Sequence, residues 1–112
     1  MGDFENLRVT SAASPDGDVV VQLIGELDLG TVPILVDALD GLIDGGPVAI
    51  ELDMSELTFI DSSGVGAYVT AFRRARAKGS RLRLGERSAP VERVLQLSGV
   101  EDALAREAAD DN

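Results

Sequence analysis

The first part of the chain alternates apolar and polar residues, and this pattern predicts two strands joined as a hairpin. Leu7 and Val9 alternate with polar neighbours across residues 6–10. Residues 18–25 (DVVVQLIG), rich in β-branched side chains, predict a second strand. Residues 14–17 (SPDG) between them form a turn sequence, because proline presets φ at the second turn position and glycine tolerates a positive φ.

The apolar spacing then changes to three and four residues, which predicts a helix over residues 31–44. Thr31 is placed to cap its first turn, Pro33 is tolerated there, and Gly45-Gly46 ends it. The apolar side chains that share one face of this helix are Val32, Leu35, Val36, Leu39, Leu42 and Ile43.

Apolar residues again occur at every second position over residues 47–54, which predicts a third strand. Residues 55–60 are expected to form a short loop after it. A second helix is predicted from Ser62 through Lys78, with Gly79 following as its cap residue. Its expected buried stripe consists of Val65, Tyr68, Val69, Phe72 and Ala75. The basic cluster in its last turns is interpreted as complementing the negative helix end, with a binding patch as the alternative.

Residues 81–85 predict a fourth strand, and a third helix is expected between Ser88 and Gly99. Its predicted apolar side consists of Val91, Val94, Leu95 and Leu97. Residues 101–108 predict a short last helix. The order β-β-α-β-α-β-α-α predicts an α/β fold with a mixed sheet and the helices mainly on one face.

The chain has 112 residues, which fits one domain, here expected over residues 1–109 with a frayed acidic tail at 110–112. Twenty acidic and ten basic residues give a formal charge of −10, which argues against nucleic acid and anionic membranes and favours a basic protein partner. The polar first ten residues and the lack of a long apolar run indicate no signal peptide and no membrane helix, so a cytoplasmic location is expected.

The chain contains no histidine and no cysteine, which excludes thiol catalysis and Cys- or His-ligated metals. A magnesium site for phosphoryl transfer built from Asp28, Asp53 and Asp61 is disfavoured, because the sequence has no phosphate-cradling loop and Lys78 is its only lysine. Asp53 is expected to cap the turn at Ser55 instead. No catalytic residue, metal or cofactor is therefore predicted, and the protein is not expected to be an enzyme.

The segment Asp61-Ser62-Ser63-Gly64 opens the second predicted helix and is the most informative part of the sequence. Free amides of the first helical turn point outward there, so either Asp61 or Ser62 can serve simply as the N-cap. The same geometry suits a phosphate on Ser62, because the helix dipole and the free amides stabilise an anion. Both interpretations follow from the residues alone.

Three segments resemble the STAS domain of bacterial anti-sigma factor antagonists: Gly25–Asp28 (GELD), Leu52–Ser55 (LDMS) and Phe59–Gly66 (FIDSSGVG). The resemblance implies a four-stranded mixed sheet backed by helices, and a partner that is both an anti-sigma factor and a serine kinase. It also implies that Ser62 is the phosphoacceptor, with Ser63 as second choice, and that Asp28 lies beside that serine. The partner-binding residues implied in this way are Asp28, Asp61, Ser62, Ser63 and Gly64.

The resemblance predicts a switch. The unmodified protein binds the kinase and so releases a sigma factor, phosphorylation of Ser62 ends the complex, and a serine phosphatase restores it. The sequence departs from the family pattern at Leu29–Pro33, where family members often carry a Thr-Ala pair, so Pro33 can shift the first helix and the neighbouring interface. The alternative is a STAS scaffold that is never phosphorylated, within a larger regulatory or transporter-associated complex.

Overall fold

The computed structural model describes residues 6–110, and these form four strands and four helices in the predicted order. The elements are β1 (Leu7–Ala13), β2 (Val19–Leu27), α1 (Val32–Asp44), β3 (Ala49–Ile60), α2 (Ser62–Ala77), β4 (Arg81–Arg87), α3 (Ala89–Ser98) and α4 (Val100–Ala109). Residues 111 and 112 of the predicted tail lie outside the described residues, and Asp110 is the C-cap of α4.

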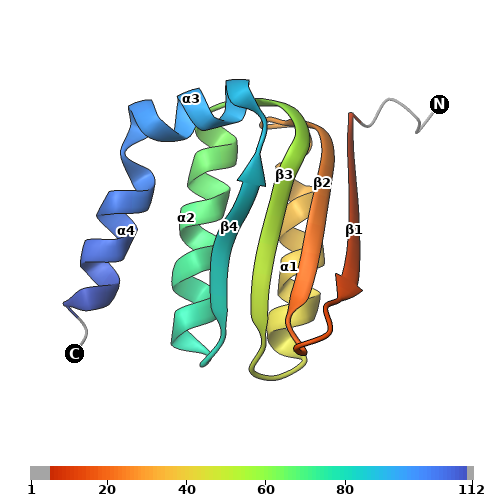
Figure 1. The fold of residues 1–112 in the computed structure, drawn as a ribbon, viewed down its shortest axis with the longest axis vertical. Helices are drawn as coiled ribbons and strands as arrows, with labels where there is room; N and C mark the ends of the chain where they lie inside the picture. Colours follow the sequence, from red (N-terminus) through yellow and green to blue (C-terminus); the bar gives the residue numbers. More distant parts are fainter. Residues whose placement is uncertain (1–5, 111–112) are drawn as a thin grey trace.

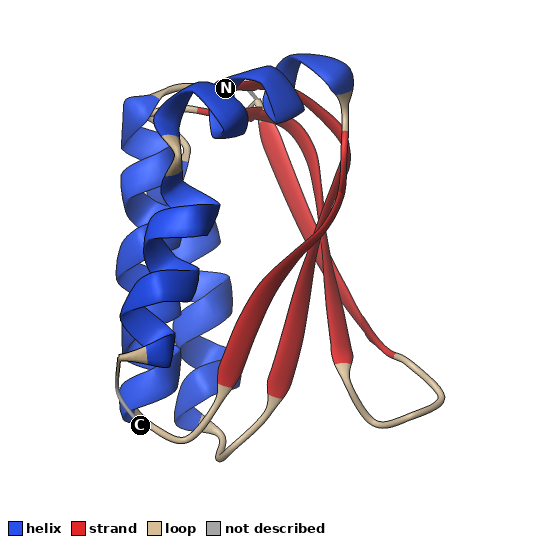
Figure 2. Ribbon diagram, turned by 60° about the vertical axis from the view of Figure 1, so that its left-hand side comes forward, coloured by secondary structure: helices blue, strands red, loops and turns tan. Residues whose placement is uncertain are grey.

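The strands form one sheet in the order β1-β2-β3-β4 (Figure 1). The hairpin of β1 and β2 is antiparallel, whereas β2 pairs with β3 and β3 with β4 in parallel. Figure 2 shows α1, α2 and α4 on one side of the sheet, with α3 lying across one end. The predicted fold class, a four-stranded mixed sheet with helices mainly on one face, is confirmed.

The core lies between the sheet and the helices. In α1 the fully buried side chains Leu35, Leu39 and Ile43 are spaced by four residues, as the helical period requires. The largest fully buried side chains are Val21, Leu23, Leu27, Leu35, Leu39, Ile43, Ile50, Leu52, Met54, Leu57 and Val91. Burying a Leu or Ile side chain stabilises the fold by about 1.5–3 kcal/mol, so this interior is the main source of stability.

The predicted loop over residues 55–60 is wrong, because β3 continues through Ile60. Its register against β2 shifts twice, between Gln22 and Ile24 and again between Gly25 and Glu26. Each shift is a bulge, in which the longer strand carries an additional residue and bends. The buried positions Met54, Leu57 and Ile60 are consequently three residues apart, a spacing that a search for strict alternation reads as the end of the strand.

The predicted stripe of α2 is shifted by about one residue. Tyr68 and Ala75 are buried as predicted, but the other buried positions are Gly64 and Ala71, and the larger Val65, Val69 and Phe72 are only partly buried. Small side chains along the centre of this helix let it lie close to the sheet, while the larger ones pack at its flanks.

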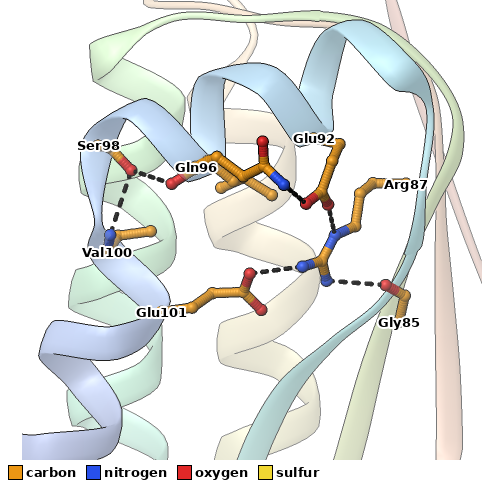
Figure 3. Close-up of polar contacts among 8 residues, drawn as sticks. Gly85, Arg87, Glu92, Gln96, Ser98, Val100 and Glu101 are labelled. Carbon is orange, nitrogen blue, oxygen red and sulfur yellow. Dashed lines mark hydrogen bonds and ion pairs between the residues drawn. The ribbon is translucent and has the colours of Figure 1, made fainter.

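Arg87, at the end of β4, holds α3 and α4 against the sheet (Figure 3). Its guanidinium group donates to Glu92 of α3 and to Glu101 of α4, each at 2.5 Å, and to the carbonyl of Gly85 at 3.1 Å. Hydrogen bonding to Glu92 raises the pKa of Arg87.

Leu97 was predicted to lie on the apolar side of α3, but its side chain is 83% exposed, so that prediction is wrong.

The basic cluster at the end of α2 is engaged in ion pairs within the molecule. Arg74 contacts Asp40 and Asp44 of α1, each at 2.9 Å, and Lys78 also contacts Asp44. Arg73 contacts Glu107 of α4 at 2.8 Å. These basic side chains join α2 to its two neighbouring helices. The predicted role, complementing the negative end of α2, does not account for these ion pairs.

Gly64 packs so closely against the sheet that any side chain would collide there. A Cβ atom at this position would lie 2.8 Å from Ile60 Cγ1 and 2.9 Å from Leu27 Cγ, whereas one at Gly66 would meet nothing within 4 Å. We expect Gly64→Ala to lower the free energy of unfolding by about 1–3 kcal/mol, because an overpacked core must distort. Gly66→Ala, the matched control, should raise the free energy of unfolding by up to about 1 kcal/mol, because alanine has the higher helix propensity. Urea unfolding of both variants measures the difference, and equal stabilities would contradict the packing argument.

Candidate functional site

The predicted site residues come together where β2 and β3 end. The amide of Asp61, directly after β3, donates to the carbonyl of Leu27, the last residue of β2, at 3.3 Å. This hydrogen bond links the turn that begins at Asp28 to the start of α2. The turn at Asp28 and the start of α2, more than thirty positions apart in the sequence, therefore lie side by side at this end of the sheet (Figure 1), and the face they form is called the Ser62 surface.

Asp61 is the N-cap of α2. Its backbone is extended, and its Oδ1 accepts a hydrogen bond from the amide of Gly64 at 3.1 Å. Ser62 is therefore the first residue of the helix and not its cap, and its side chain is exposed. Ser63 is partly buried. Of the two serines, Ser62 is the more exposed.

Asp28 organises the turn between β2 and α1. Its Oδ1 accepts hydrogen bonds from the amide of Gly30 at 3.0 Å and from that of Thr31 at 3.1 Å. The hydroxyl of Thr31 donates to the carbonyl of Glu26 at 2.8 Å, so Thr31 occupies the N-cap position without capping α1 through its side chain. Pro33 lies in the first turn, and α1 begins at Val32.

Two exposed apolar side chains flank this surface and were missed by the sequence analysis. Leu29, in the turn after Asp28, is 75% exposed, and Phe59, near the end of β3, is 45% exposed. Large exposed apolar side chains are a signature of contact surfaces when they gather in one place. For Leu29, the sequence signal of an exposed apolar side chain was its position inside a turn. For Phe59 there was no such signal, because its outward direction follows from the bulges in β3.

Tyr68 lies further along α2 and does not belong to this surface. Its side chain is 4% exposed, and burial, together with the charge of Glu101, raises the pKa of Tyr68 to about 12. The helix therefore presents its first turn to solvent and buries the face around Tyr68.

The three aspartates considered as a magnesium site each accept a hydrogen bond from a backbone amide in a different part of the chain. Asp53 accepts a hydrogen bond from the amide of Ser55 at 2.9 Å, as predicted, but both residues lie within β3, so the predicted turn at Ser55 is wrong. Asp28 and Asp61 accept from amides of their own turns. Within residues 6–110, no group of three acidic side chains is arranged to hold a metal ion.

The family model described as "Mlab, STAS domain" matches residues 10–106, nearly the whole described chain. An anti-sigma-B factor antagonist of Listeria monocytogenes is 30% identical over 99 residues, which cover 88% of this chain and 87% of the relative. The chain belongs to the STAS-domain family of anti-sigma factor antagonists. The family predicted from the GELD and DSSG segments is thereby confirmed.

Solved structures of this family share the fold. The unphosphorylated form of the anti-sigma factor antagonist SpoIIAA aligns with a TM-score of 0.70 and 29% identity, covering 91% of this chain and 97% of SpoIIAA. The phosphorylated form of SpoIIAA from Bacillus aligns with a TM-score of 0.64 and the same identity, over 88% of this chain and 98% of the other. Both forms of SpoIIAA are therefore similar in architecture to this STAS domain.

Within the described part of the chain, no helix of the STAS domain is both long and apolar enough to span a membrane.

The cap at Asp61 holds the first turn of α2. We expect Asp61→Ala to lower the free energy of unfolding by about 1 kcal/mol, because the amide of Gly64 loses its side-chain acceptor. Asp61→Asn, which keeps an acceptor oxygen, should recover most of this loss. Ser62→Ala should stay within about 0.5 kcal/mol of the parent, because the exposed hydroxyl is not the cap. Chemical denaturation of the three variants tests the assignment, which a larger loss for Ser62→Ala than for Asp61→Ala would contradict.

Proposed function

We propose that this STAS domain antagonises an anti-sigma factor that is also a serine kinase, and that phosphorylation of Ser62 ends the complex. The observation that carries the proposal is the exposed Ser62 at the first position of α2, beside a cap that Asp61 already provides. A kinase can reach such a hydroxyl without unfolding the helix. The matched family supplies the class of partner.

The charge of the surrounding surface supports a switch based on repulsion. The sequence contains no lysine or arginine between Arg8 and Arg73, so neither the turn at Asp28 nor the first half of α2 carries a basic side chain. A phosphate on Ser62 would therefore find no arginine within these two segments to neutralise it. Its charge of about −1.5 to −2 would remain directed toward the partner.

The size of the effect is sufficient to break a complex. Two like charges about 4 Å apart repel by roughly 4 kcal/mol at an effective dielectric constant of 20. A quarter of that energy lowers affinity about fivefold, and the full amount lowers it nearly a thousandfold. A single phosphate facing an acidic group of the kinase is thus enough to release the antagonist, and a serine phosphatase would reverse the step.

The scaffold alternative is less well supported by this geometry. Exposed apolar side chains around Tyr68 would favour a permanently assembled scaffold, but Tyr68 is buried. The exposed apolar side chains Leu29 and Phe59 lie instead beside the Ser62 surface. Leu29 is in the turn after β2, and Phe59 is near the end of β3. We infer that the complex is formed at this end of the domain, in a cytoplasmic setting and without nucleic acid or membrane.

Substitutions at Ser62 separate binding from modification. Ser62→Ala should bind the cognate kinase like the parent but take up no phosphate from ATP. Ser62→Asp should bind at least about fivefold more weakly while keeping a native circular-dichroism spectrum, because the added charge acts at the interface. Mass spectrometry of the peptide that contains Asp61 locates the phosphate and distinguishes Ser62 from Ser63. Parent-like binding of both variants would contradict the switch.

Leu29 tests the apolar part of the same surface. Leu29→Ala should lower affinity for the kinase about fivefold or more, as expected for an apolar anchor at an interface, without changing the free energy of unfolding by more than about 0.5 kcal/mol. Leu97→Ala is the matched control, because Leu97 is similarly exposed but lies on α3. Surface plasmon resonance measures both affinities, and a larger loss for Leu97→Ala would move the interface to α3.

A further inference from the structure

A cavity of about 410 Å³ opens at the end of the molecule opposite Ser62, between the start of β4 and the second half of α2. Figure 1 shows this part of α2 between β4 and α4. The volume falls within the range of small-molecule sites, about 300–1,000 Å³. The residues that line the cavity are Asp18, Ala49, Ile50, Phe72, Arg76, Arg81, Leu82, Arg83 and Ala108.

The wall of the cavity is mainly apolar. Leu82 and Ile50 belong to the buried core of the sheet, and Phe72 and Ala108 contribute from α2 and α4. The guanidinium group of Arg76 lies 5.8 Å from the centroid of the Phe72 ring, which places a cation beside an aromatic face. An apolar compound would therefore find a surface to contact, with positive charge next to it.

The side chains that line the cavity include more basic than acidic groups, although the domain as a whole is acidic. Three arginines and one aspartate line it, a formal charge of +2, in a chain whose net charge is −10. Glu107 pairs with Arg76 at 3.4 Å and Glu51 with Arg83 at 2.6 Å, so these two arginines are partly neutralised. Arg81 is exposed and forms no ion pair with any residue between 6 and 110.

We propose that this cavity binds a small amphipathic carboxylate, with its hydrocarbon in the cavity and its head group at Arg81. A cavity of about 150 Å³ accommodates one benzene ring, so a volume of 410 Å³ has room for a hydrocarbon body of about ten carbons. A carboxylate is the complement that an unpaired guanidinium group prefers. This site goes beyond the proposed function and does not involve Ser62.

The experiment uses decanoate as the probe and two-dimensional amide NMR of the full chain without any kinase. Decanoate should cause saturable shifts confined to the start of β4, the second half of α2 and α4. Acetate should cause none, because it lacks a hydrocarbon body. Decanol and decyltrimethylammonium should bind at least about fivefold more weakly than decanoate, because neither carries a negative head group.

Variants identify the residues responsible. Arg81→Gln should weaken decanoate binding about fivefold, whereas Arg93→Gln, which removes an equal charge from an exposed position on α3, should leave it unchanged. Ala108→Leu, which fills the cavity from α4, should abolish saturable shifts. The proposal is overturned if decanoate causes no saturable shift, if decanol or the ammonium compound binds equally well, or if the two arginine variants behave alike. Because Ser62→Ala should bind decanoate like the parent, failure here is distinguishable from failure of the switch.

Discussion

The candidate site depends on how closely the first turn of α2 lies against the end of the sheet. Gly64 contacts Leu27 and Ile60 at a distance that leaves no room for a side chain, and the amide of Asp61 donates to the carbonyl of Leu27. Because Leu27 is fully buried, this contact fixes the turn that follows it relative to the helix. Ser62 is therefore presented by the rigid frame of the domain, although it lies at a junction between two elements.

The distribution of charge separates the two ends of α2. Its last turns carry Arg74 and Arg76, which are joined to acidic side chains of α1 and α4 and so contribute to the fold. Its first turn carries no basic side chain, and the favourable partners for an anion there are backbone amides and the helix dipole. One helix consequently stabilises the structure at its end and leaves its start available for a partner.

The sequence was sufficient to predict the order of elements and the mixed sheet, because these depend on local periodicity, and the DSSG segment was sufficient to place Ser62 at the start of a helix. It was insufficient for residues 55–60, since bulges place Met54, Leu57 and Ile60 in the core at a spacing that resembles neither a strand nor a loop. Leu97 was misplaced for a related reason, because α3 crosses the end of the sheet and buries only a narrow face. Register and packing angle are set by contacts distant in sequence.

The choice between Asp61 and Ser62 as the cap could not be made from the sequence, yet it decides how a phosphate would act. If Ser62 were the cap, its oxygen would already hold an amide, and modification would disturb the helix. Because Asp61 holds the amide of Gly64, a phosphate on Ser62 would add charge near free amides, where an anion is stabilised by about 0.3–1 kcal/mol. The repulsion between this phosphate and an acidic group of the partner, roughly 4 kcal/mol at about 4 Å, is several times larger than that stabilisation. The same charge can therefore be tolerated by the domain and still exclude its partner.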